Sequence, residues 1–183
     1  MKKILMTMVA AFAAVSMNAQ VYVGGSFGLA SFDNGNKSQT AFKIVPEIGY
    51  NLDENIAVGV SFGYAQGSTA AAWNLSNPYE DLKVFEIAPY LRYTLVKMGV
   101  VSLFADGQLS YSHIDNDGAK ANAFGIGVAP GLAVNLNDKL SFVTHVGFVG
   151  YKQSKADYDG AKAVSTVGLD LDNEITFGLY YNF

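Results

Sequence analysis

Large apolar residues alternate with smaller or more polar ones along most of this chain, and this pattern constrains the fold more than any other feature. The clearest example is the last ten residues, where every second position is apolar: Ile175, Phe177, Leu179, Tyr181 and Phe183. Successive side chains of a β-strand point to opposite faces, whereas a helix repeats its apolar positions every three to four residues. The alternation therefore predicts strands that each have one apolar face.

Eight segments carry this pattern. The expected strands are residues 21–30, 42–52, 56–65, 84–95, 101–113, 123–134, 140–151 and 174–183. The expected connections alternate between short turns and longer polar loops, with turns at 53–54, 97–99 and 137–139 and loops at 31–40, 67–81, 115–120 and 153–170. Pro46, Pro89 and Pro130 fall inside expected strands, and since proline removes a ladder donor we expect a bulge or strand end at each. An even number of strands with short turns at one end predicts an all-β fold, an eight-stranded antiparallel up-and-down barrel.

Composition and strand length indicate which face of each strand points outward. Only 15% of the residues are charged, against about a quarter in a typical soluble domain. The expected strands exceed the roughly 5–6 residues usual in soluble proteins and suffice for the roughly 9–11 of a tilted bilayer crossing. The second face is rich in Gly, Ala and Ser, which suits a narrow lumen. We therefore expect a transmembrane barrel with its apolar face toward lipid; the alternative is a secreted soluble barrel of lipocalin type.

Aromatic residues gather near both ends of the apolar faces, as in the interfacial belts of membrane barrels. At the short-turn end the expected anchors are Tyr50, Tyr93, Phe142, Tyr181 and Phe183. At the long-loop end the belt consists of Phe42, Phe62, Tyr64, Phe85, Tyr111, Phe124 and Phe148. Trp73, the only tryptophan, lies in the loop 67–81 and is expected to anchor the outer interface; alternatively it belongs to an adhesive or receptor-like loop tip.

The first residues resemble a secretory signal peptide. Lys2 and Lys3 precede an apolar stretch over 4–15, and a short polar segment follows. We expect cleavage after Ala19, which assigns 1–19 to the signal peptide and 20–183 to the barrel domain. The chain contains no cysteine, so neither a disulfide scaffold nor a thiolate metal site is expected.

Taken together, the signal peptide, eight amphipathic strands and a last strand ending in Tyr181-Asn182-Phe183 resemble the OmpA/OmpX-like eight-stranded outer-membrane β-barrel family. The resemblance implies a place in the outer membrane of a Gram-negative envelope, with both termini periplasmic. It also implies recognition of the C-terminal strand ending in Phe183 by the outer-membrane barrel assembly machinery. We expect the barrel alone, without a peptidoglycan-binding domain, and a monomer, because a closed barrel has no free sheet edge.

Four charged residues lie on the small-residue face and are therefore expected to point into the lumen: Glu47, Glu86, Arg92 and Asp106. Arg92 is the only arginine. A charge in a narrow lumen is costly unless it is paired, so we expect Arg92 to bind one or more of these carboxylates. Such a network is either a structural plug or a charge gate controlling a small conductance.

Few residues point to chemistry. His113 lies beside Ser112 and near Asp115, and some enzymes that modify lipid A place Ser and His at the rim of a similar barrel. Neighbouring strand residues face opposite sides, however, so these three do not form a triad and we assign no catalytic residue. His145 is expected to fill the lumen.

We likewise assign no cofactor and no metal, since the acidic loops follow no calcium-loop pattern, and no nucleic-acid partner, since the net charge is −4. The expected role is structural, or in interactions with an extracellular ligand through the loops. The alternatives are a narrow pore for ions or very small solutes, and a lipid A-modifying enzyme.

Overall fold

The computed structural model describes residues 20–33, 38–67, 82–158 and 160–183, with the side chains of 29–33, 38–41 and 170–175 left undescribed. The expected signal peptide and Trp73 lie outside the described residues.

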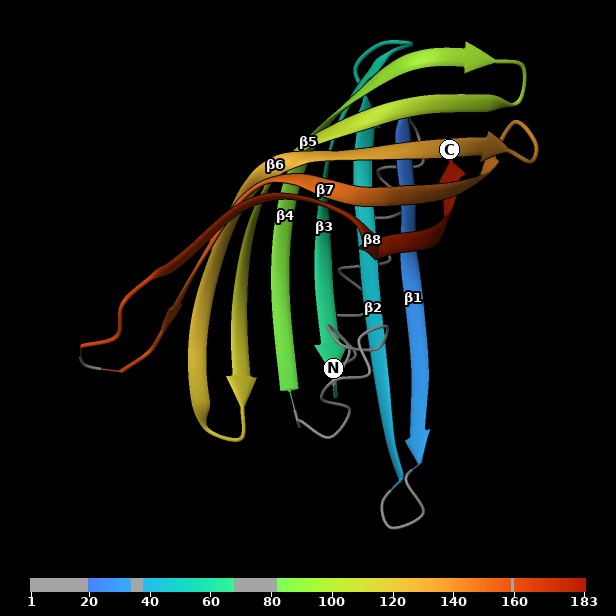
Figure 1. Ribbon diagram of the computed structural model, residues 1–183. Coiled ribbons are helices and arrows are strands. Elements are labelled where there is room, and N and C mark those ends of the chain that lie inside the picture. Colours follow the sequence, from blue (N-terminus) through green and yellow to red (C-terminus); the bar gives the residue numbers. More distant parts are fainter. Residues whose placement is uncertain (1–19, 34–37, 68–81, 159) are drawn as a thin grey trace, which may run out of the picture.

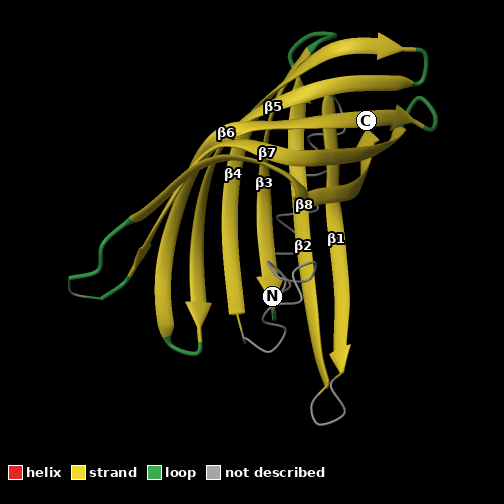
Figure 2. Cartoon of the chain, in the orientation of Figure 1, coloured by secondary structure: helices red, strands yellow, loops and turns green. Residues whose placement is uncertain are grey.

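Eight antiparallel strands form one closed barrel in sequence order, and β1 pairs with β8 to complete it (Figure 1; Figure 2). The strands are β1 Val21–Asp33, β2 Ser38–Asn51, β3 Ile56–Gln66, β4 Leu82–Met98, β5 Val101–Asn116, β6 Ala119–Asn135, β7 Leu140–Ala156 and β8 Val164–Asn182. The predicted fold class is confirmed. No helix long and apolar enough to cross a membrane occurs in the described ranges.

The two ends of the barrel differ as expected. The turns after β2, β4 and β6 lie at one end, here called the turn end, together with the first and last described residues. Asn51 N donates to Gln20 O at 2.7 Å, and Phe183 N donates to Val21 O at 3.1 Å. Asp53 shapes the turn after β2, because its carboxylate accepts hydrogen bonds from the backbone amides of Asn55 and Ile56. The opposite end is called the loop end.

Three of the expected loops are shorter than predicted, and in the first of them β1 extends to Asp33 and β2 begins at Ser38, inside the expected loop 31–40. Between β5 and β6 only Asp117 and Gly118 are unpaired, with φ of 50° and 91°, which gives the tight hairpin turn favoured by the twist of the strands. The Asp115 carboxylate accepts a hydrogen bond from Gly118 N at 3.2 Å. Likewise β7 extends to Ala156 and β8 begins at Val164, inside the expected loop 153–170. Backbone pairing continues the strands through these outer segments. Such pairing does not require the apolar alternation from which the strand bounds were predicted.

The apolar faces point outward. On β4, Phe85, Leu91 and Tyr93 are about half exposed, whereas Ala88 and Tyr90 between them are buried in the lumen. This arrangement excludes the soluble lipocalin-type alternative, which requires large apolar residues inside the barrel.

Bulges adjust the register at three places, and one of them overturns a prediction. The β7–β8 register shifts between Val146 and Phe148, where Gly147 has φ of 77°. The extra residue turns Phe148 inward, and only 4% of it is exposed. The expectation that Phe148 belongs to the outer aromatic belt is therefore wrong.

The prolines match their prediction in one case of three. Pro130 lies where the β6–β7 register shifts between Val128 and Gly131. Pro46 and Pro89 lie inside strands without any shift, so for these two the expected bulge or strand end is wrong. The ladder simply lacks the pairs involving each proline on one side, between β2 and β3 for Pro46 and between β4 and β5 for Pro89.

Candidate functional site in the lumen

Arg92 lies at the centre of the turn-end half of the lumen, bound to the carboxylate directly across the β4–β5 ladder. Its Nε donates to Asp106 Oδ1 at 2.8 Å and its Nη2 to Asp106 Oδ2 at 2.7 Å. Only 4% of the Asp106 side chain is exposed, so the pair lies away from solvent. A bidentate pair of this kind holds both side chains in one geometry.

Glu47 on β2 extends this network across the lumen. Its Oε1 lies 3.6 Å from Arg92 Nη2 and accepts a hydrogen bond from Tyr90 Oη at 2.6 Å. Tyr90 Oη in turn lies 2.7 Å from Tyr22 Oη. The network thus connects β1, β2, β4 and β5.

His145 on β7 joins from the other side, and the expectation that it fills the lumen is confirmed. Its Nε2 lies 2.8 Å from Asp106 Oδ2, and its Nδ1 lies 3.3 Å from Thr176 Oγ1 on β8. The ring packs edge-on against Phe104, with centroids 5.3 Å apart. The Asp106 carboxylate therefore accepts from two donors.

Four aromatic rings surround the Arg92 guanidinium. Its Cζ lies 4.1 Å from the ring centroid of Phe104, 5.2 Å from that of Tyr90, 5.5 Å from that of Tyr180 and 5.9 Å from that of Tyr22. A cation over aromatic faces is attracted by the ring quadrupole. We call Arg92, Asp106, Glu47, His145 and these four rings the lumen plug.

Glycines make room for the four rings. Each ring lies over a glycine that pairs directly with it on the neighbouring strand: Tyr22 over Gly49, Tyr90 over Gly59, Phe104 over Gly131 and Tyr180 over Gly24. A Cβ at any of these glycines would lie between 2.1 and 2.6 Å from the ring above it. Side chains larger than hydrogen cannot occupy these positions while the rings stay in place.

The rings were missed by sequence reasoning, although a signal existed. Tyr90 and Tyr180 interrupt faces that otherwise carry small or polar residues, and each interruption coincides with a glycine-rich neighbouring strand. A large residue on the small face indicates lumen filling.

Glu86, the fourth predicted lumen residue, lies apart from Arg92. Its Oε2 accepts a hydrogen bond from Ser112 Oγ at 2.7 Å, toward the loop end. The structure thus brings Glu47, Arg92 and Asp106 together and leaves Glu86 outside the plug.

Sequence comparison assigns the chain to a family. The model of the outer membrane protein beta-barrel domain matches residues 4–183. The chain belongs to this family of outer-membrane β-barrels. No curated protein matches it in sequence.

Two solved structures share the fold of this outer-membrane barrel. The crystal structure of Neisserial surface protein A is 16% identical with a TM-score of 0.55, and the match covers 89% of this chain and 97% of that one. The outer membrane protein OprG from Pseudomonas aeruginosa is 13% identical with a TM-score of 0.52, covering 90% and 96%. At such identities the likeness concerns the fold alone.

The predicted interface anchors of the barrel lie at the turn end. Tyr50, Tyr93 and Tyr181 are each more than a third exposed on the outer surface. Tyr50 Oη donates to Gln20 Oε1. Tyr181 packs edge-on against Phe183 with centroids 5.1 Å apart, and Phe142 stacks on Phe177.

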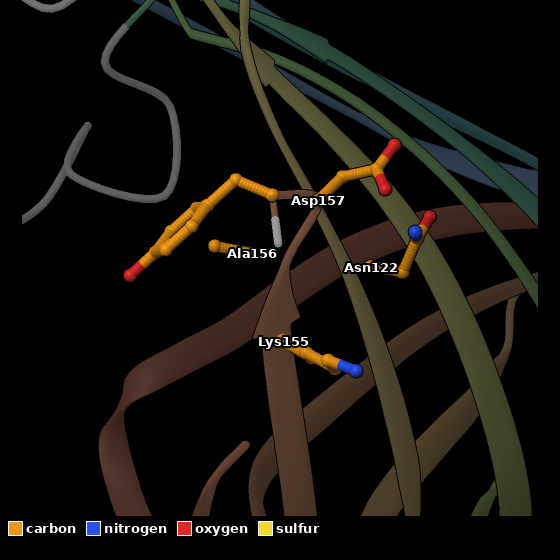
Figure 3. A pocket seen from close by; sticks show the side chains of 5 residues that line it. Asn122, Lys155, Ala156 and Asp157 are labelled. Atoms are coloured by element: carbon orange, nitrogen blue, oxygen red, sulfur yellow. The ribbon is translucent and has the colours of Figure 1, made fainter. Parts of the chain in front are cut away.

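At the loop end, the residues considered for catalysis point to opposite faces. Ser112 is buried in the lumen with Glu86, whereas His113 Nδ1 lies 2.9 Å from Asn122 Oδ1 on the other face. Beside Asn122 the outer surface carries an open depression of about 590 Å³, lined also by Lys155, Ala156, Asp157 and Tyr158 (Figure 3). Across the described ranges, no three His, Cys, Asp or Glu side chains cluster as metal ligands do.

Proposed function

We propose that this outer-membrane barrel acts as a structural and interaction protein whose lumen is closed by the lumen plug, and that it neither conducts solutes nor catalyses a reaction. The supporting observation is the bidentate Arg92–Asp106 pair packed within four aromatic rings, with donors and acceptors from six strands. A charge held this way in a narrow lumen stabilises one closed arrangement, whereas a gate needs two of similar free energy.

Planar-bilayer recording tests this proposal. The wild-type barrel is expected to give no discrete conductance steps. Urea unfolding is the second measurement: Arg92→Ala is expected to unfold at lower urea concentration, since removing one partner of a buried pair costs about 3–5 kcal/mol. Glu86→Gln is the matched control, because Glu86 lies outside the plug. Regular single-channel steps from the wild type would establish the narrow-pore alternative, and unchanged stability of Arg92→Ala would refute the plug.

The lipid A-modifying alternative has a separate test. Expression of the barrel is expected to leave the lipid A mass spectrum unchanged, because Ser112 and His113 face opposite sides of β5. A new deacylated or acylated species that disappears in His113→Ala would overturn the non-catalytic proposal.

We also propose an orientation and partners for the barrel, on the basis of its family membership. We place the turn end, with Gln20 and Phe183, in the periplasm, where the C-terminal strand would be recognised by the barrel assembly machinery. The loop end then faces outward, where the depression beside Asn122 is available to an extracellular ligand. Outer-membrane lipid surrounds the monomer.

A further inference from the structure

The seam that closes the barrel is paired over only part of its length. β1 and β8 pair at five positions, from Tyr22 with Asn182 to Ser26 with Gly178. β1 continues to Asp33 paired with β2, and β8 extends back to Val164 paired with β7. Figure 1 shows β1 and β8 diverging beyond the paired stretch, toward different hairpins.

Glycines lie on the lumenal face of both diverging strands. Gly28 and Gly168 occupy lumen-facing positions on the two diverging strands. A Cβ at Gly168 would meet nothing within 4 Å, and one at Gly28 would meet only Lys43 Cβ, at 3.8 Å. Neither position therefore fills the loop-end half of the lumen with a side chain.

An apolar groove lies on the outer surface where the paired stretch ends. It measures about 280 Å³ and is lined by Gly25, Phe27, Phe142, Phe177, Gly178 and Leu179. The rings of Phe142 and Phe177 stack 5.9 Å apart, and Phe27 is 65% exposed. The groove has no charged lining residue, and its volume is slightly smaller than the roughly 300–1,000 Å³ of common ligand pockets. It therefore suits a single hydrocarbon chain.

A cation lies on the lumenal side of the same gap. Lys43 on β2 pairs with Gly28 and shares the face of Glu47, which points into the lumen. Lys43 is exposed, and within the described part of the chain no hydrogen bond or ion pair engages its ammonium group. Its positive charge complements a single carboxylate.

We propose that the β1–β8 gap binds a long-chain fatty acid, with its carboxylate on Lys43 inside the barrel and its chain passing Gly28 into the groove beside Phe27. Unpaired backbone at membrane depth is tolerated where it lines a hydrated space. An amphiphile suits this position, because its polar head would lie on the lumenal side of the gap and its apolar chain on the lipid side. A phospholipid, with two chains and a larger head group, does not fit this single groove.

Tryptophan quenching by a fatty acid brominated in mid-chain tests the site in phospholipid vesicles. In a Trp73→Phe background the chain has no other tryptophan, so Phe27→Trp reports on the groove alone. Leu109→Trp is the matched control, since Leu109 faces lipid on β5, away from the seam. At trace fatty acid we expect several-fold stronger quenching at position 27 than at 109, and we expect Lys43→Gln to abolish the difference.

The outcomes separate the possible ligands. Equal quenching of both reporters by the fatty acid would overturn the site, and an unchanged preference in Lys43→Gln would overturn the assignment of the carboxylate. A phospholipid carrying the same brominated chain is expected to quench both reporters equally; preference for it at position 27 would also overturn the proposal. Folding of each variant is verified by its heat-dependent mobility on SDS gels, and Leu179→Trp replaces Phe27→Trp if that variant fails to fold.

Discussion

At the residue scale, the lumen plug depends as much on absent side chains as on present ones. Two hydrogen bonds hold the Tyr90 ring, because its hydroxyl donates to Glu47 and accepts from Tyr22, so the ring cannot retreat from the strand beneath it. Gly59 lies under that ring, and a Cβ there would come within 2.4 Å of Tyr90 Oη. The glycine is therefore required by packing and not by its backbone angles.

Gly59→Ala is accordingly expected to lower the free energy of unfolding by about 1–3 kcal/mol, the usual cost of overpacking. Gly107→Ala is the control, because its nearest neighbour, Leu91 O, would lie 3.8 Å away. Urea unfolding of the barrel in lipid vesicles measures both. Equal stabilities of the two variants would contradict the proposed role of the glycine.

At the element scale, strand interiors could be predicted from alternation, but bulges and strand ends could not. The outer parts of β7 and β8 lie beyond the predicted apolar faces. Backbone pairing continues them, together with side-chain hydrogen bonds such as that from Gln153 Nε2 to Ser165 Oγ. The bulge at Gly147 is one residue long, and it reverses the faces of every position that follows it on β7. Glycine at a positive φ permits this, although glycine alone did not indicate where it would occur.

The reversal has a direct test with the same tryptophan-free background. Phe148→Trp is expected to resist quenching by a brominated phospholipid, because Phe148 packs in the lumen against Lys152, whose Nζ lies 4.5 Å from the ring centroid. Val149→Trp is expected to be quenched strongly, since Val149 is outward and 45% exposed. The opposite ranking would restore Phe148 to the outer belt and remove the bulge.

At the scale of the whole molecule, the barrel is asymmetric along its axis. The turn end holds both described chain ends, three turns and the plug. The loop end holds the unpaired part of the β1–β8 seam and, apart from the two-residue turn at Asp117 and Gly118, the longer connections. This asymmetry supports the proposed orientation, with the turn end in the periplasm.

Epitope insertion tests the orientation. A tag after Gly118, in the turn at the loop end, is expected to bind antibody on intact cells, and a tag after Asp138, at the turn end, only after the outer membrane is opened. Both sites are exposed turns, where insertions are tolerated best. Labelling of the Asp138 tag on intact cells would reverse the orientation.

The sequence by itself determined the strands, their number, the outward direction of the apolar faces and the inward direction of Arg92, because side-chain alternation is a local property of an extended backbone. Only the tertiary structure decided which inward residues meet. Arg92 is near Asp106 by ladder register, but its contacts with Glu47, Tyr22 and Tyr180 join strands distant in sequence, and Glu86 on the same face lies too far along the axis to join them. Closure of the barrel sets those cross-lumen contacts. It also leaves β1 and β8 paired at only five positions, which the alternation within either strand alone does not specify.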